Sequence, residues 1–278
     1  MRKAISTYVH VRERLHPGIL GRLASGGAAG IEIFAHRGHF DYEPGAQLRE
    51  LAAWFGAQKD VELFSLHAPI FASGAWGRFD SPPLNIAGHE RRERITAMDE
   101  IKRAIEVAET LPFQFLVLHV GSRGDSWDER RFEGALSSIE HLHAFARPLG
   151  VSLLLENIQN EVTLPEKLDE LIRTLHYNDI GVCLDLGHAH IEPGVEQAME
   201  LLAPRIRQVH VHDNHGQQDE HLWPGEGTID WTRTTELLRA LPQAPSLVLE
   251  IEGDPGGNPD YGKTVPEHMQ AAWRTLSL

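Results

Sequence analysis

The sequence lacks the features that mark secreted, disulfide-bonded or membrane-spanning proteins. It has one cysteine in 278 residues, so no internal disulfide can form and no Cys-x-x-Cys zinc pattern exists. Its longest apolar runs have the length of a strand, well short of a bilayer span. The N-terminal segment MRKAISTYVH has no long apolar core of a secretory signal. We therefore expect a cytoplasmic protein that does not enter a membrane.

Positive charge is also scarce. The 26 Lys and Arg residues stand against 40 Asp and Glu, which gives a net charge of −14 with histidine neutral. Non-specific nucleic-acid binding depends on Lys and Arg to neutralise phosphates, so this composition disfavours it. The exclusion weakens where bound cations supply positive charge locally. Histidine, in contrast, is abundant, with 17 copies whose positions decide their meaning.

Short apolar, β-branched runs recur along the chain and alternate with segments of helical periodicity. Residues 92–109, for example, place Ile95, Met98 and Ile101 at three-residue spacing on one helix face. Strands are predicted over residues 3–9, 30–34, 61–67, 114–120, 151–156, 179–185, 206–212 and 246–251. Strands separated by helices pair in parallel through right-handed crossovers. Eight such units predict an α/β protein, a (β/α)8 TIM barrel that forms a single domain over residues 1–278. An open doubly wound sheet is the alternative, but no G-x-G-x-x-G follows the first strand.

Several segments and residues outside the strand ends are assigned from their length, composition or position. The connection 72–92 is too long for an ordinary βα loop, so it is a candidate lid or substrate loop. The charged run HERRER at 89–94 is predicted to be a solvated helix face. Cys183 is predicted to be a small buried barrel residue. A further set of histidines is predicted on the surface or in helices: His36, His39, His141, His143, His176 and His190.

Six successive predicted strands each end in a histidine, aspartate or glutamate. These residues are His67, His119, Glu156, Asp185, His210 and Glu250. The C-terminal ends of barrel strands meet at one rim, so these side chains should converge in space. A glutamate that follows several aliphatic residues is costly to bury, and a divalent cation removes that cost. A hydrogen-bonded strand end explains any one of the six, but the whole series predicts a metal centre. Imidazole and carboxylate ligands favour Zn²⁺ or Mn²⁺, with Mg²⁺ and Co²⁺ as alternatives.

Seven short motifs follow one another along nearly the whole chain: LHAP, LHVGS, LLEN, CLDLGHAH, VHVHDN, DEHLWPGEGTIDW and LVLEIE. As a set they resemble the xylose-isomerase-like TIM barrel superfamily. That superfamily contains sugar and sugar-phosphate isomerases and epimerases together with the type-four apurinic endonucleases. The resemblance implies a core metal site at Glu156, Asp185, His210 and Glu250. In the endonuclease branch it implies additional zinc ligands at His67, His119, His188, Asp219 and His221.

The isomerase branch implies proton transfer beside the carbonyl of a sugar or sugar phosphate. A divalent ion would stabilise the enediolate, while Glu156 and Glu250 act as acid and base. The predicted substrate contacts are His188, Arg123, Trp223 and His212, with Arg123 as an anion-binding candidate. The epimerases often carry an arginine six residues after the strand-seven histidine, but that position is Gly216 here. The substrate contacts of that subfamily therefore do not carry over as a set.

A multi-zinc phosphodiesterase that acts on damaged DNA is the alternative, because all nine positions hold competent ligands. Such an enzyme also needs positive and wedge-forming side chains to hold and open a duplex. The sequence offers Arg37, Phe40 and Tyr42 after the second strand and Trp76, Arg78 and Phe79 after the third. Those are few positive charges, and GIEIFAHRGHFDY looks more like the isomerase branch, so sugar chemistry is the preferred hypothesis.

A non-catalytic barrel that binds metal or sugar is a further alternative. Retention of every core carboxylate and histidine argues against it. Several points stay open at the level of sequence: the substrate, the metal and its number per chain, the choice between isomerisation, epimerisation and dehydration, and whether the chain forms a homo-oligomer.

Overall fold

Eight parallel strands close into a barrel in the computed structural model, which describes residues 1–72, 76, 82–253 and 261–277. The strands follow one another around the barrel in chain order, and the last pairs with the first. They are β1 (Arg2–Ser6), β2 (Gly30–Phe34), β3 (Glu62–His67), β4 (Phe115–His119), β5 (Ser152–Glu156), β6 (Gly181–Asp185), β7 (Ile206–Val211) and β8 (Ser246–Leu249). This confirms the predicted single-domain TIM barrel.

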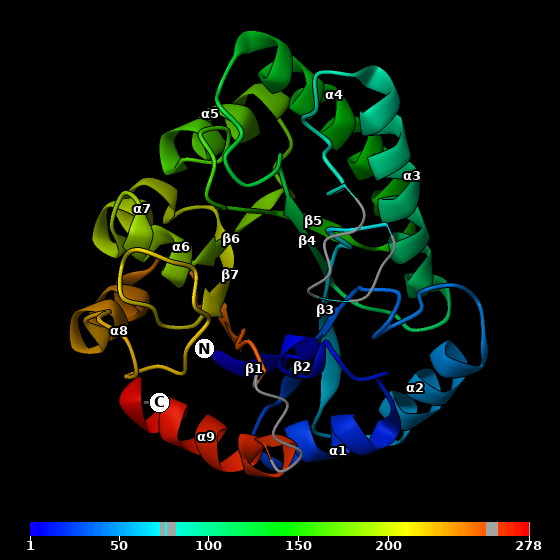
Figure 1. The fold of residues 1–278 in the computed structure, drawn as a ribbon, viewed down its shortest axis with the longest axis vertical. Helices are drawn as coiled ribbons and strands as arrows, with labels where there is room; N and C mark the ends of the chain where they lie inside the picture. Colours follow the sequence, from blue (N-terminus) through cyan, green and yellow to red (C-terminus); the bar gives the residue numbers. More distant parts are fainter. Residues whose placement is uncertain (73–75, 77–81, 254–260, 278) are drawn as a thin grey trace.

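Helices surround the barrel on its outside (Figure 1). The α-helices are α1 (Pro17–Ser25), α2 (Ala46–Ala57), α3 (Arg91–Glu106), α4 (Glu129–Ala146), α5 (Pro165–Leu175), α6 (Leu186–Ile191), α7 (Val195–Leu202), α8 (Trp231–Ala240) and α9 (Tyr261–Thr275). Short 3₁₀ helices are η1 (Thr7–His10), η2 (Val107–Glu109) and η3 (Arg147–Leu149). Within the described ranges, every helix is too short or too polar to cross a membrane.

The first strand is shorter than predicted. It ends at Ser6 rather than at residue 9, because the Ser6 hydroxyl accepts a hydrogen bond from the Tyr8 amide (3.3 Å) and caps η1. This turn places Tyr8 at the C-terminal rim of the barrel. The other strands agree with prediction to within two residues at each end.

The predicted lid lies partly outside the described residues, which include only Ala72, Trp76 and 82–92 of that segment. Its last residues open α3, which begins at Arg91, and most of the charged run 89–94 is exposed as predicted.

The barrel interior is built in layers, because side chains two residues apart point to the same side of a strand. Val117, Leu154 and Cys183 form an apolar cluster in one layer. The residues two positions later, His119, Glu156 and Asp185, then reach the C-terminal rim. The fold therefore delivers the predicted strand-end residues to one place, and Cys183 is buried as predicted.

Candidate metal centre

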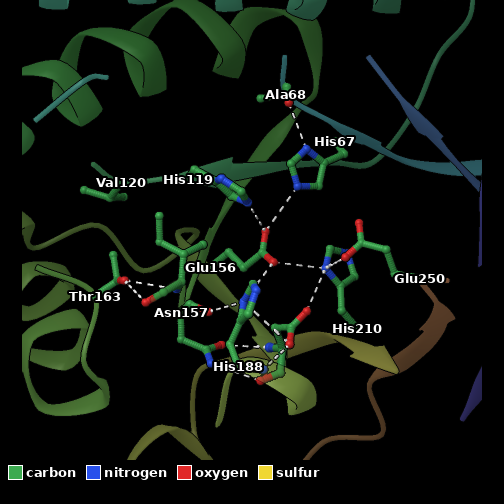
Figure 2. A network of polar contacts seen from close by, with 12 residues as sticks. His67, Ala68, His119, Val120, Glu156, Asn157, Thr163, His188, His210 and Glu250 are labelled. Carbon is green, nitrogen blue, oxygen red and sulfur yellow. Dashed lines mark hydrogen bonds and ion pairs between the residues drawn. The ribbon is translucent and has the colours of Figure 1, made fainter. Parts of the chain in front are cut away.

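Glu156 lies at the centre of the rim, between histidines from three strands (Figure 2). Its Oε2 atom is 3.3 Å from His67 Nε2 and 3.2 Å from His119 Nε2. Its Oε1 atom is 3.2 Å from His210 Nδ1, which is also 3.2 Å from Glu250 Oε2. Asp185 Oδ2 also lies near this nitrogen, 3.8 Å from His210 Nδ1.

These contacts define two ligand sets that share one carboxylate. The inner quartet consists of Glu156, Asp185, His210 and Glu250, and the bridging trio of His67, His119 and Glu156. Within each set, one ligand atom of every residue lies within 4.8 Å of the others. The structure thus brings together all six strand-end residues that the sequence singles out.

A third set, the outer cluster, consists of His188, His212, Asp219 and His221. Asp219 is its centre, with Oδ2 3.1 Å from His188 Nε2 and Oδ1 3.2 Å from His221 Nε2. Asp185 joins this cluster to the inner quartet. Its Oδ1 atom accepts a hydrogen bond from the His188 amide at the start of α6 (2.7 Å) and lies 3.0 Å from His212 Nε2.

The donor atoms of these sets fit divalent cations. Glu156 Oε2, Glu250 Oε1 and Asp219 Oδ1 are buried and accept no hydrogen bond, although imidazole nitrogens lie close to two of them. Buried carboxylate oxygens normally have hydrogen-bond partners, so oxygens without them are suited to an ion. Nitrogen and oxygen donors at this spacing suit Zn²⁺ or Mn²⁺.

The charges of the site are strongly coupled. Burial would raise the pKa of Glu156, but His210 and His119 outweigh burial and hold that pKa well below its usual range. Burial likewise opposes ionisation of Asp185, yet His188 and His212 lower its pKa to about 2. Conversely, burial would lower the pKa of His221, and Asp219 raises it to about 10. Protonated histidines thus balance the carboxylates, and a cation would take the place of those protons.

Backbone carbonyls orient three of the histidines. The Nδ1 atoms of His67, His188 and His221 lie 2.8, 2.9 and 2.8 Å from the carbonyl oxygens of Ala68, Asn157 and Glu250. A donor hydrogen bond from Nδ1 fixes the tautomer in which Nε2 carries the lone pair. In all three residues Nε2 is the atom that faces a carboxylate of the site. Metal-binding histidines are usually fixed in this way.

The His210 ring has the reverse orientation, and its partner Glu32 was not predicted from the sequence. Its Nδ1 atom faces the inner quartet, whereas Nε2 faces the carboxylate of Glu32 on β2, 3.2 Å from Oε1. Glu32 is 0% exposed. The available signal was the acidic residue inside the apolar strand GIEIF. It was overlooked because Glu32 lies in the middle of its strand rather than at its end.

His212 was predicted to contact substrate, but its geometry assigns it a different place. It is 0% exposed, it is absent from the cavity lining, and its Nε2 atom lies 3.0 Å from both Asp185 oxygens. The ring fits against Gly187, where an added Cβ would lie 1.9 Å from His212 Cε1. Gly187 in the motif CLDLGHAH therefore makes room for His212, whose ring faces Asp185 within the metal centre rather than the cavity.

Asp213 organises the loop that carries Asp219 and His221, and it too was not predicted. Its Oδ1 atom accepts from the amides of Asn214 (2.9 Å) and Ile229 (3.1 Å). Its Oδ2 atom accepts from the Gly225 amide (2.9 Å) and from Trp231 Nε1 (2.7 Å). Four hydrogen bonds donated to one buried carboxylate tie both ends of this loop together.

A cavity of about 920 Å³ opens over the three ligand sets. Its floor includes Glu156, Glu250 and His188, and one wall is aromatic, formed by Tyr8, Phe34 and Trp76. The Tyr8 ring centroid is 4.9 Å from that of Phe34 and 5.3 Å from that of Trp76. Tyr8 was not predicted as a site residue, because the first strand was expected to continue through it.

The predicted substrate contacts differ in their positions. His188 and Arg123 line the 920 Å³ cavity, and both also line an adjoining cavity of about 600 Å³. Arg123 is exposed, and the interactions found for the described residues include no ion pair or hydrogen bond of its guanidinium. Trp223 is buried in the main core and stacks on His268, outside the cavity lining. The loop after β7 folds this tryptophan inward, so it does not offer a face for sugar stacking.

The side chains considered for DNA binding are mostly engaged elsewhere. Phe40 and Tyr42 are buried in the core, and Arg37 pairs with Glu100 at 2.7 Å. Of the second group only Trp76 is described, and it lines the cavity, whereas Arg78 and Phe79 lie outside the described residues.

Two histidines predicted on the surface or in helices, His36 and His39, lie in the buried loop after β2 instead. His39 Nδ1 bonds the Glu13 carbonyl at 2.5 Å and Nε2 lies 2.9 Å from Thr7 Oγ1, which explains its burial.

Comparison with known proteins decides the family. A family model described as xylose isomerase-like TIM barrel matches residues 20–272. The chain belongs to this family. An uncharacterized protein of Methanocaldococcus jannaschii is 26% identical over 64% of this chain and 66% of its own length. A probable endonuclease 4 of Natronomonas pharaonis is 26% identical over 56% of this chain and 62% of its own. The chain thus matches less than two thirds of the length of these relatives.

Two solved structures illustrate the shared fold. The crystal structure of a D-tagatose 3-epimerase-like protein has a TM-score of 0.79 at 24% identity, covering 100% of this chain and 98% of that one. The IOLI protein with a bound zinc atom has a TM-score of 0.76 at 20% identity, covering 99% and 96%. At these identities the likeness shows the fold, and the family resemblance inferred from the motifs is confirmed.

Proposed function

We propose that this chain is a divalent-metal-dependent isomerase or epimerase of a sugar or sugar phosphate. The observation that carries the proposal is the cavity itself, a space of small-molecule size with buried carboxylates on its floor and an aromatic wall. Such a wall suits the C–H face of a sugar, and the carboxylates suit its hydroxyl and carbonyl end. The sugar epimerases among the structural neighbours are consistent with this chemistry.

Glu156, Asp185, His210 and Glu250 would hold the cation. When bound, a divalent ion there would polarise a substrate carbonyl and the adjacent hydroxyl. Two structural neighbours, the IOLI protein with a bound zinc atom and a Thermus thermophilus protein soaked with ZnCl2, are consistent with metal binding. The three carboxylates of the quartet suit Mn²⁺, and its imidazole suits Zn²⁺.

The chain's own residues supply the proton chemistry. Glu156 on β5 and Glu250, which follows β8, line the cavity from different strands, so they can reach a substrate carbon from two sides. One carboxylate would take the proton from the carbon beside the carbonyl, and the other would return a proton. His188 and Arg123 line the same cavity. In this proposal His188 would bond a substrate hydroxyl, and Arg123 would bind an anionic group.

A multi-cation phosphodiesterase is the second candidate, and a specific observation favours it. Glu156 is shared between the inner quartet and the bridging trio, and the outer cluster stands beside them, so three cations could be held. The relatives named probable endonuclease 4 point the same way. Against it, the described residues of the cavity lining include two arginines, Arg12 and Arg123, and no lysine, and Arg12 pairs with Glu252 at 2.8 Å.

Solvent isotope exchange tests the first proposal. Protein reconstituted with Mn²⁺ or Zn²⁺ is incubated with a panel of ketoses and ketose phosphates in D2O. Deuterium at the carbon beside the carbonyl is then measured by NMR. We expect incorporation into at least one sugar and none with Glu250→Gln. Cleavage of a duplex containing an abasic site, without exchange into any sugar, would instead establish the second candidate.

A further inference from the structure

A buried carboxylate lies directly beneath the metal-ligand layer. Glu32 on β2 is fully buried, and its Oε1 and Oε2 atoms lie 3.2 and 3.4 Å from His210 Nε2. An ionised carboxylate in a barrel interior is costly, and an apolar side chain could fill such a position. Val117, Leu154 and Cys183 form such an apolar cluster elsewhere in the barrel interior. Glu32 instead places a carboxylate beside His210.

Glu32 is held in a fixed orientation by two neighbouring strands. Ser65 Oγ on β3 donates to Glu32 Oε2 at 2.7 Å, and Gln208 Nε2 on β7 donates to the same oxygen at 2.6 Å. The pairing of β2 with β3 shifts register between Ile31 and Glu32, and such irregularities redirect side chains. Oε2 thus accepts from two neutral donors and also lies 3.4 Å from His210 Nε2, whereas Oε1 is buried and lies 3.2 Å from the same nitrogen.

His210 differs in this respect from the other histidines of the site. Neutral backbone carbonyls orient His67, His188 and His221, whereas a charged side chain faces His210. A carboxylate that accepts the second ring N–H makes the imidazole a stronger ligand and fixes its tautomer. With Nε2–H directed to Glu32, the Nδ1 lone pair points at the inner quartet.

We propose that Glu32 is a positioning residue of the metal centre, which accepts the Nε2–H bond of His210 and thereby strengthens His210 as a metal ligand. Ser65 and Gln208 keep Glu32 in place for this task. The inference rests on the proposed metal centre and is independent of whether a sugar or a phosphodiester is the substrate. If Glu32 had only a structural role, its hydrogen bonds with Ser65 and Gln208 would be sufficient, and replacing Glu32 would not change the affinity for metal.

Zn²⁺ affinity of the full chain tests the proposal. Competition with a chromophoric chelator is measured for wild type, Glu32→Gln and the matched control Glu100→Gln. Glu100 is also a buried carboxylate, but it bonds Arg37 and Tyr42 outside the barrel. We expect about a 10–100-fold loss of affinity at the tightest site in Glu32→Gln, with Glu100→Gln within about twofold of wild type.

The Zn²⁺-induced rise in Tm supplies a second readout, because it subtracts any loss of stability common to the metal-free and loaded proteins. It should shrink in Glu32→Gln and persist in Glu100→Gln. If Glu32→Gln does not fold, the proposal is tested with Ser65→Ala instead. This variant removes only one hydrogen bond to Glu32 and should still weaken Zn²⁺ binding measurably.

Unchanged affinity in Glu32→Gln, or in Ser65→Ala where that variant decides, would overturn the proposal. Equal losses in Glu32→Gln and Glu100→Gln would overturn it too, because they would indicate a general structural effect. Absence of Zn²⁺ binding by the wild type would instead refute the metal centre, so the two failures are distinguishable.

Discussion

The inner quartet and the outer cluster use the same kinds of ligand but are held in different ways. The quartet comes from the ends of four adjacent strands, β5 to β8, and its side chains are almost completely buried. The outer cluster comes from α6, from the end of β7 and from the loop tied by Asp213, and the Asp219 side chain is 17% exposed. Sheet hydrogen bonds therefore fix the quartet, whereas loop hydrogen bonds fix the outer cluster.

This difference suggests which of the two ligand clusters would distinguish the two proposed reactions. The barrel strands hold the proposed ligands of the quartet, and a cation there would serve either proposed chemistry. The outer cluster can be lost without changing a strand, so under these proposals it would separate a one-metal sugar enzyme from a multi-cation phosphodiesterase. Perturbing each region separately should break or sharpen this comparison.

The largest effect is expected from the quartet. Glu156→Gln and Glu250→Gln should each lower turnover by at least about 10²–10⁴-fold, because each removes a group that transfers a proton. Glu156→Gln should also weaken both cation sets that share this carboxylate. Turnover is measured as deuterium exchange and folding by circular dichroism, with the exposed Glu166→Gln as control. Wild-type turnover in either quartet variant would refute the assigned roles.

A change confined to the outer cluster should separate the two functions. Asp219→Ala removes the carboxylate that joins His188 and His221, so the outer cation should be lost while the quartet keeps its own. The loss of outer affinity should exceed the roughly 10–100-fold cost of removing a partner that does not itself bind the metal. Isotope exchange into sugars should survive this substitution. If exchange disappears together with the outer cation, the two regions act as one site.

Metal binding to the outer cluster should strengthen with rising pH. Burial opposes protonation of His221, but Asp219 raises its pKa to about 10, so His221 carries a proton at neutral pH in the metal-free protein. A cation must displace that proton, and apparent affinity should rise about tenfold per pH unit per proton released below that pKa. Asp185, with a pKa lowered to about 2, adds no such dependence. Zn²⁺ titrations of the wild type from about pH 6 to about pH 9 measure this dependence. An outer-site affinity that does not change over this range would contradict the assignment.

His212, which contacts Asp185 of the inner quartet, leaves little space for a larger side chain at Gly187. A methyl group at Gly187 would collide with His212, so Gly187→Ala should destabilise the fold by about 1–3 kcal/mol through overpacking. Gly21→Ala in α1 is the matched control, because its Cβ meets nothing and should stabilise by about 0.5–1 kcal/mol. Urea denaturation measures both. Equal stability of Gly187→Ala and wild type would mean that His212 is not packed as described.

The smallest effect on the fold is expected at Arg123. Since Arg123 is exposed and has no ion pair among the described contacts, Arg123→Gln should change stability by less than about 0.5 kcal/mol. If the substrate is phosphorylated, KM should rise roughly tenfold with little change in kcat, as one charge-assisted bond is lost. An unchanged KM for every phosphorylated sugar would favour a neutral substrate.

The sequence predicted the barrel and its rim because both follow from local patterns. Apolar runs identify the strands, and an ionisable residue at each strand end must reach the shared rim, which placed His67, His119 and Glu156 correctly. Asp219 and His221 were inferred only from the family resemblance, since the polar loop 212–221 has no periodicity that fixes its shape.

The remaining site residues depended on contacts that a linear pattern does not reveal. Glu32 reads as an isolated acid within a strand until β7 is placed across from it. Tyr8 reaches the cavity only because Ser6 ends β1 early. Trp223 and His212 were predicted as substrate contacts from their place after β7, but tertiary packing buries both.

Metal content of the purified, extensively dialysed chain tests the central claim most directly. Elemental analysis should find at least one tightly bound divalent ion per chain in the wild type, and markedly less in Glu156→Gln. A wild-type chain that retains no divalent ion, even after incubation with Zn²⁺ or Mn²⁺, would contradict the proposal that these buried carboxylates and histidines form a metal centre.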